Sequence, residues 1–303
     1  CLILGEAIEE LSPNETDDDS SGSYQKTRKL ERKVNFQFVI DLIENPLQRS
    51  TFGYSLVHFA SLSGQQEILK SIVEQNPDQI NDKNESHETP IMLAIVGGKV
   101  DEIKFLLTFP GKTDIKMLNV YGQTLMHYVS LAAKNQLEIF KLLLPFFSDW
   151  NMIDYHGTTP FMYMTWNGCM DVIEYIWTLQ KTPDVYEANS NGRTALHFAT
   201  FDSFSEEANI QVLQFLIEKD ANVVCEQGKS ILLNALNYGK VQITKFLLSK
   251  FSKTEIKQLM SDIQEKNHLY AMEVLNEARK LRKEEKAKRK NTRSLFPTKY
   301  SFN

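Results

Sequence analysis

One short motif recurs along the chain at an almost constant interval, and this interval limits the folds that are open to it. In the clearest copy, residues 191–199 (NGRTALHFA), a glycine and a threonine precede a short apolar segment. Gly192 permits the positive φ of a tight turn, and Thr194 can cap a helix because its hydroxyl accepts from backbone N–H groups. Leu196 and Ala199 are three residues apart and so share one helix face. The motif therefore predicts a turn followed by a short helix.

Six copies of the motif can be aligned on the residue in the capping position. These residues are Ser55, Thr89, Thr124, Thr159, Thr194 and Ser230. They are separated by 34, 35, 35, 35 and 36 residues. A fixed period of this size is typical of stacked repeats, in which no single repeat can bury its apolar face alone.

The Thr-Pro-Leu-His-x-Ala-like signature at this period resembles that of ankyrin repeats. The resemblance extends over residues 27–280 approximately, and six copies in register make it specific. It implies an all-α solenoid, built from stacked helix-turn-helix repeats with β-turn or hairpin tips. His58, His127 and His197 occupy the same position of the motif. The resemblance implies that these histidines join neighbouring turns by hydrogen bonds, so their role is structural.

Each repeat is expected to contain a short inner helix, a break and a longer outer helix. The outer helices carry apolar residues at i, i+3 and i+4 spacing, which places one apolar stripe against the neighbouring repeat. Glycines mark the break in four repeats: Gly64, Gly98, Gly168 and Gly239. In the third repeat Asn135 stands in this position, two residues late.

The composition divides the chain into five parts. Residues 1–25 carry seven acidic residues and no Lys or Arg, so 1–26 is expected to be a disordered acidic tail. An N-terminal capping helix is expected at 27–49 and six ankyrin repeats at 50–250. A C-terminal helical cap ending in a basic run is expected at 251–290, followed by a frayed tail at 291–303.

Two segments outside the repeat pattern have more than one interpretation. The fifth repeat carries an insertion at 202–207, which is either a solvated loop or a contact surface around Phe204. The basic run, residues 279–290, is a solvated helix end, a nuclear import signal, or a contact for anionic lipid or nucleic acid.

The sequence does not contain a recognisable catalytic, metal or cofactor motif. No pair of His or Cys residues has metal-ligand spacing, and no Gly-rich phosphate loop is present. We therefore expect a chain that is not an enzyme, with no cofactor, no metal and no small-molecule substrate. The chain has no run of 18 apolar residues, so no membrane span is predicted. The repeats are mildly acidic, which argues against binding of nucleic acid along them. A monomer is expected, located in the cytoplasm, with the nucleus as the alternative.

The family resemblance implies that a concave face binds partners. Residues beside the turn glycine and before the break belong to this face: Phe52, Tyr54, Tyr121, Gln123, Tyr155, His156, Trp166, Arg193, Lys229 and Tyr238, together with Ser86, Glu88, Asn167, Asn191, Gln227 and Asn237. Aromatic side chains are frequent interface anchors, so Tyr121, Tyr155 and Trp166 are interpreted as a binding ridge. The alternative is that these side chains pack on adjacent turns.

These expectations give two hypotheses for function. The first is a non-catalytic scaffold or adaptor that binds a protein partner of unknown identity through the concave face. The second is an ankyrin regulatory or targeting module of a larger protein, such as a kinase, a ubiquitin-ligase adaptor or a channel. The absence of an initial Met leaves the second hypothesis open.

Overall fold

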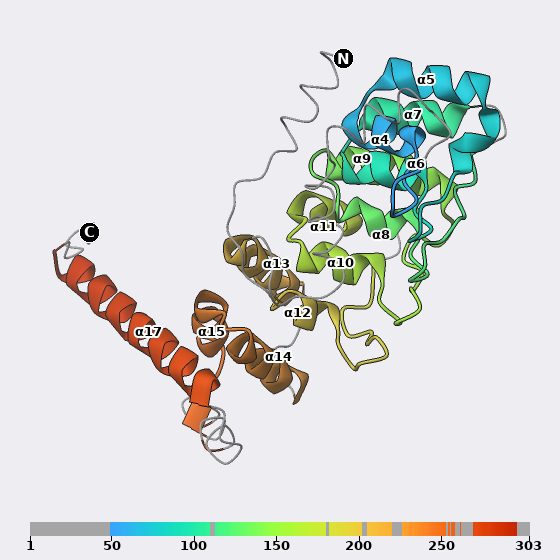
Figure 1. The fold of residues 1–303 in the computed structure, drawn as a ribbon. Coiled ribbons are helices and arrows are strands. Elements are labelled where there is room, and N and C mark those ends of the chain that lie inside the picture. Colours follow the sequence, from blue (N-terminus) through green and yellow to red (C-terminus); the bar gives the residue numbers. More distant parts are fainter. Residues whose placement is uncertain are drawn as a thin grey trace. The chain divides into compact units, whose positions relative to one another are not determined.

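The computed structural model describes residues 49–109, 113–179, 182–201, 205–219, 226–252, 254, 256–257, 261 and 269–295. Within these ranges the regular secondary structure is entirely helical (Figure 1). The chain forms two compact units, residues 1–146 and 147–303. The expected acidic tail and residues 27–48 of the expected capping helix lie outside the described residues, as does Phe204 of the insertion.

The described residues of the first unit form three consecutive helix pairs. Its elements are α4 (Leu56–Ser63), α5 (Gln66–Gln75), the 3₁₀ turn η1 (Pro77–Asn81), α6 (Pro90–Val96), α7 (Val100–Thr108), α8 (Leu125–Val129), α9 (Gln136–Leu143) and η2 (Leu144–Phe146). The inner helices contact in the order α4, α6, α8, and the outer helix α5 contacts α7. Each repeat thus packs on the next one along the chain (Figure 1).

The second unit repeats this arrangement and adds a long terminal helix. Its elements are α10 (Pro160–Trp166), α11 (Met170–Ile176), α12 (Ala195–Phe198), α13 (Glu206–Glu218), α14 (Glu226–Asn237), α15 (Val241–Leu248) and α17 (Leu269–Leu295). The inner helices α10, α12 and α14 contact in order, as do the outer helices α11, α13 and α15. Helix α17 packs on both α14 and α15.

The apolar stripes of the outer helices form the core, as their spacing predicts. The stripes are Leu69/Ile72/Val73, Ile103/Leu106, Ile139/Phe140/Leu143, Val172/Ile173/Ile176, Val212/Leu213/Leu216 and Ile243/Leu247/Leu248, and all these side chains are buried. Burial of one such side chain contributes about 2 kcal/mol, so the stack is held by many similar terms between neighbouring repeats.

The breaks between inner and outer helices require a left-handed residue. Gly64, Gly98, Gly168 and Gly239 all have φ between 64° and 79°. Asn135 takes the same conformation in the third repeat, with φ 61° and ψ 23°. Its Nδ2 also donates to the carbonyl of Gly98 at 3.0 Å, which ties this break to the preceding one. Asn is the side chain that tolerates this region best after glycine, so it replaces the missing break glycine.

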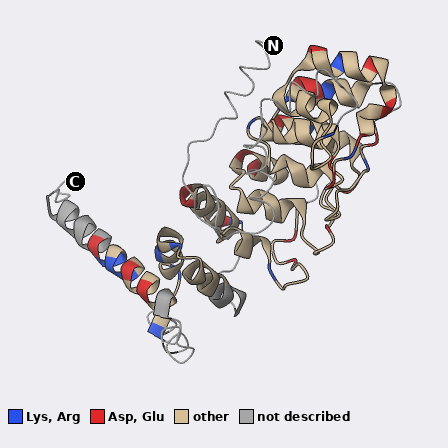
Figure 2. Ribbon diagram, viewed as in Figure 1, with Lys and Arg blue, Asp and Glu red and all other residues tan. Residues whose placement is uncertain are grey.

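Helix α17 is anchored only along its first turns within the described residues. Ala271, Val274, Leu275 and Ala278 are buried at i, i+3, i+4 and i+7 spacing. One turn later, the guanidinium of Arg282 donates to the carbonyl of Leu248 at 2.5 Å. Both signs of charge occur on the described part of the helix (Figure 2). The helix continues to Leu295, so residues 291–295, expected to fray, are helical.

Candidate partner-binding site at the repeat tips

In the first five repeats, the tip, which is the turn before the inner helix, is held by one side-chain oxygen. In the third repeat, Asn119 Oδ1 accepts from the backbone N–H groups of Tyr121 at 3.0 Å and Gln123 at 2.9 Å. Ser50, Asp154 and Asn189 make the same two bonds in their own tips, and Asn84 makes the second. Such local bonds favour turns over regular structure. The tip backbone is therefore fixed independently of the side chains between the two bonded amides.

The same residues close each tip through the backbone. Gly122 N–H donates to the carbonyl of Asn119 at 3.0 Å, and Asn119 N–H donates to the carbonyl of Gln123 at 3.3 Å. Gly122 has φ 77°, and His87 takes the equivalent position of the second tip with φ 57°. Neighbouring tips of the first unit are also joined, because Val120 N–H donates to the carbonyl of Ser86 at 3.0 Å.

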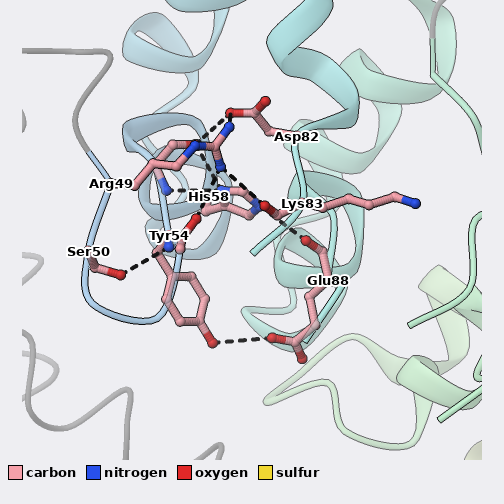
Figure 3. Close-up of polar contacts among 9 residues, drawn as sticks. Arg49, Ser50, Tyr54, His58, Asp82, Lys83 and Glu88 are labelled. Carbon is pink, nitrogen blue, oxygen red and sulfur yellow. Dashed lines mark hydrogen bonds and ion pairs between the residues drawn. The ribbon is translucent and has the colours of Figure 1, made fainter. Parts of the chain in front are cut away.

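His58 links the inner helix of the first repeat to the second tip (Figure 3). Its Nδ1 accepts from the backbone N–H of Ser55 at 3.1 Å, so Nε2 carries the proton. Nε2 then donates to the carbonyl of Glu88 at 3.1 Å. Burial lowers the pKa of His58 to about 4 and keeps the ring neutral. These are contacts of the kind that the family resemblance implied for His58.

His127 and His197 repeat the first half of this arrangement. Their Nδ1 atoms accept from the backbone N–H groups of Thr124 at 3.1 Å and Thr194 at 3.2 Å. Both rings are buried. Burial, and secondly the charge of Arg193, lowers the pKa of His197. Histidine thus satisfies the donor at the start of α8 and α12, where a Glu or Gln more often does so.

A charged clamp joins the first tip to the second (Figure 3). The guanidinium of Arg49 forms an ion pair with Asp82 at 2.9 Å and donates to the carbonyls of Gly53 and Lys83, each at 3.1 Å. The hydroxyl of Ser55 donates to the same Asp82 carboxylate at 3.0 Å. These bonds hold the two chain segments in one register.

A buried carboxylate connects three repeats of the first unit. Glu88 Oε2 accepts from Asn84 Nδ2 at 2.7 Å and from the Tyr54 hydroxyl at 3.2 Å, while Oε1 accepts from the Tyr128 hydroxyl at 3.0 Å. Asn119 Nδ2 in turn donates to the Tyr128 hydroxyl at 3.0 Å. Burial, and secondly Glu88, raises the pKa of Tyr128 well above its ordinary value. Glu88, expected on the concave surface, is therefore part of the polar interior.

The predicted helix caps are placed correctly in five repeats and wrongly in one. Ser55, Thr89, Thr124, Thr159 and Thr194 each directly precede an inner helix. At Thr159 the hydroxyl accepts from Met162 N–H at 3.2 Å. Ser230 is instead the fifth residue of α14, which begins at Glu226, so this predicted cap is wrong. The residue five positions before Ser230 is Cys225, which lacks the oxygen that fixes the other tips.

The structure distributes the predicted partner-binding residues over several environments. Phe52 is 48% exposed, Tyr155 70% and Tyr238 44%, and His156 is also exposed. Tyr54, Tyr121, Trp166 and Arg193 are half-buried. Lys229 lies within α14, and its side chain is outside the described residues. The exposed residues are therefore the best candidates for direct contact with a partner: Phe52, Tyr155, His156 and Tyr238.

Besides Glu88, one predicted surface residue requires correction. Gln123 is buried, and its Oε1 accepts from Asn119 Nδ2 at 2.7 Å, so it supports the tip from inside. Trp166, predicted to belong to the binding ridge, is half-buried, and its ring lies 6.2 Å from that of Phe198 and 6.1 Å from that of Phe201. The predicted ridge combines Tyr121 of the first unit with residues of the second, and it stays a prediction.

Three further apolar side chains at the tips are exposed, and none of them was predicted as a partner contact. Val120, Met152 and Ile153 are each at least 40% exposed. They lie within two residues of Asn119 or Asp154, the side chains that fix these tips. These side chains could have been found from the sequence by their distance from Asn119 or Asp154. Their distance from the turn glycine alone does not identify them.

The described residues also contain no group of three or more His, Cys, Asp or Glu that could hold a metal ion. Within the same part of the chain, every helix is too short or too polar to cross a membrane. The tips present exposed apolar side chains on a backbone that is closed by hydrogen bonds.

Comparison with known proteins identifies the family. The profile described as "Ankyrin repeats (3 copies)" matches residues 57–144, 129–208 and 177–260, which together span more than half of the chain. The chain belongs to the ankyrin repeat family, as its signature and all-α repeat fold indicate.

Two curated relatives share this region at low identity. The chain is 25% identical over 180 residues to the nuclear factor NF-kappa-B p105 subunit of Gallus gallus, a match of 56% of this chain and 17% of that protein. It is 24% identical over 208 residues to a putative ankyrin repeat protein of Rickettsia felis (strain ATCC VR-1525 / URRWXCal2), a match of 68% of this chain and 49% of that protein. The matched region thus spans half or less of either relative.

Proposed function

We propose that this chain is a non-catalytic scaffold or adaptor, in the cytoplasm or nucleus, which binds a protein partner through its repeat tips and the adjoining ends of its inner helices. The observation that carries the proposal is the exposure of large apolar side chains at the tips, above all Phe52 and Tyr155. Exposed apolar groups on a backbone held by hydrogen bonds favour association, because little conformational entropy is lost on binding.

The hydrogen bonds of the tips support this interpretation. Asp154 Oδ1 holds the backbone N–H groups of His156 and Thr158, both at 2.8 Å, and leaves the Tyr155 side chain outside this network. In the first tip, Ser50 Oγ holds Phe52 and Tyr54 in the same way, at 3.2 and 2.9 Å. The exposed rings are therefore not needed to close their turns.

The proposal is tested by quantitative affinity capture from cell extract with the native chain and with Phe52→Ser and Tyr155→Ser. The matched control for Phe52 is Phe146→Ser, because Phe146 is 47% exposed in the same unit but lies at the end of an outer helix. We expect proteins that are lost from the tip variants and retained by the control. Identical profiles for all four chains, each with the native circular dichroism spectrum, would refute binding at the tips.

The second candidate is a regulatory or targeting module within a larger protein. It is favoured by the relatives, since the matched region spans only 17% and 49% of their lengths. An immunoblot of the source cells with an antibody against the repeats distinguishes the two. A band much larger than this chain supports the module, and a single band of its own size refutes it.

A further inference from the structure

Five aromatic side chains form a continuous strip along one face of the second unit. This aromatic strip consists of Tyr163, Trp166, Phe198, Phe201 and Tyr238. Consecutive ring centroids are 5.0 to 6.2 Å apart. The strip crosses three repeats, because its members come from α10, from α12 and the turn after it, and from the end of α14.

The strip has a buried floor and exposed edges. Tyr163, Phe198 and Phe201 are buried, whereas Trp166 is half-buried and Tyr238 is 44% exposed. Edge-to-face packing fixes these rings, since Trp166 and Tyr238 meet Phe201 at interplanar angles of 84° and 62°. An apolar side chain that adds to the strip therefore meets rings that are already ordered.

A cation lies on the strip. The guanidinium carbon of Arg193 is 4.7 Å from the centroid of the Phe201 ring. Arg193 is half-buried, and among the described residues it forms no ion pair with a carboxylate. A guanidinium that stacks over an aromatic ring contacts the ring with its flat face. Its N–H donors point outwards in the guanidinium plane and stay available for hydrogen bonds. Arg193 can therefore receive a carboxylate without leaving Phe201.

The surroundings of Arg193 preserve its positive charge. His197 lies one helical turn further along the chain, and burial and secondly Arg193 lower its pKa, so the imidazole is neutral at pH 7. The site thus presents the fixed cation of Arg193 next to apolar rings. A partner that buries this cation without a counter-charge would leave it uncompensated, which is costly.

We propose that the aromatic strip with Arg193 binds a short partner segment in which an Asp or Glu adjoins a bulky apolar side chain. The carboxylate accepts from the Arg193 guanidinium, and the apolar side chain packs between Trp166 and Tyr238. This inference rests on the proposed protein-binding function and specifies the chemistry of the partner for the second unit. It selects acidic segments against basic ones, because a Lys or Arg would face Arg193 with the same charge.

The test begins with a phage-displayed library of random 12-residue peptides, selected on the full chain. Enriched peptides are synthesised with a fluorescent label, and their affinity is measured by anisotropy. We expect enrichment of Asp or Glu beside Phe, Trp, Tyr or Leu, and weaker binding at high salt. Arg193→Gln should weaken binding about tenfold or more, since a charge-assisted hydrogen bond is lost.

Lys219→Gln is the matched control. The ammonium of Lys219 lies 5.4 Å from the centroid of the Phe215 ring, so this variant also removes a cation from an aromatic ring of the second unit, but away from the strip. It should leave the affinity unchanged. A charge swap separates recognition from structure: Arg193→Glu should lose the acidic peptide and bind the peptide in which Lys replaces the acid.

Four results would overturn the inference: no enriched peptide, enrichment without acidic residues, an affinity within twofold after Arg193→Gln, or no recovery in the charge swap. The proposed function is tested by a different measurement, the affinity capture. It would be refuted by identical capture profiles for Phe52→Ser, Tyr155→Ser and Phe146→Ser. Peptides that respond to the tip variants and not to Arg193→Gln would therefore refute only the present inference.

Discussion

The carboxylate of Glu88 accepts a hydrogen bond from the hydroxyl of Tyr128, 40 residues further along the chain and one repeat away. The same carboxylate accepts from Tyr54 of the preceding repeat at 3.2 Å. One buried acid therefore couples three repeats of the first unit through their polar interior. A repeat stack is stabilised mainly by contacts between neighbouring repeats. Such a group therefore increases cooperativity between repeats that are not adjacent.

The first prediction concerns removal of this acid. Glu88→Ala leaves the Asn84 amide and the hydroxyls of Tyr54 and Tyr128 without their acceptor, and all three lie in or beside the core. We expect a loss of about 2–4 kcal/mol in the free energy of unfolding, measured by urea denaturation. The control is Glu138→Gln, which removes an exposed ion pair with Lys104 and should change stability by less than about 0.5 kcal/mol. Equal effects would contradict the network.

The second prediction concerns pH. The pKa of His58 is lowered from 6.5 to about 4, so the folded state takes up its proton less readily than the unfolded chain. Its contribution to stability is therefore complete above pH 6.5 and is lost as the pH falls towards 4. The loss should reach about 3 kcal/mol, as judged by urea denaturation between pH 4 and 7.5.

His58→Gln serves as the control for this titration. The variant should be less stable at pH 7, and its stability should depend less on pH between 4 and 6.5. A smaller dependence should remain from His197, whose pKa is also lowered. An unchanged pH profile in the variant would show that His58 does not carry the effect.

The third prediction separates the two roles of Asp154. Its Oδ1 fixes the fourth tip, and its Oδ2 accepts from the Tyr163 hydroxyl at 3.0 Å. Asn119 occupies the equivalent position and makes the equivalent contact, with its Nδ2 donating to Tyr128. Asp154→Asn should therefore change the midpoint of urea denaturation little, whereas Asp154→Ala should cost about 2–3 kcal/mol. A large loss in the Asn variant would mean that the negative charge is required.

The fourth prediction concerns the left-handed break of the third repeat. Asn135→Ala combines a strained φ of 61° with loss of the bond to Gly98, and should cost about 2 kcal/mol in thermal or urea unfolding. Asn135→Gly loses the bond but removes the strain, so it should be the more stable of the two variants. The reverse order would show that the conformation of this break is not the source of the effect.

The period of the capping residues was sufficient to predict the helix pairs and their apolar stripes. The prediction from the period failed at Ser230, because a capping residue and a turn glycine are not sufficient to form the turn before an inner helix. The other tips contain Ser50, Asn84, Asn119, Asp154 or Asn189 five residues before the cap, and the last has Cys225. Without a side-chain acceptor for the tip amides, the helix begins earlier and absorbs the turn.

The surface was harder to predict than the fold. Gln123 and His156 both adjoin a turn glycine, yet Gln123 is buried and His156 is exposed. The difference depends on contacts with other residues, such as the Asn119 amide that holds Gln123. The surroundings of Trp166 also depend on another repeat, since Phe198 and Phe201 approach it from the next one along the chain. Periodicity within one repeat does not contain this information.

The side-chain oxygen that fixes each tip has a consequence for how recognition changes in such a chain. Because Asp154 holds the amides of His156 and Thr158, the identity of Tyr155 between them has little influence on folding. Mutations at this position can therefore accumulate without loss of the native state and can be selected for a new partner. Binding specificity and stability therefore depend on different side chains in these turns. Such turns are suitable positions for engineering new binding proteins.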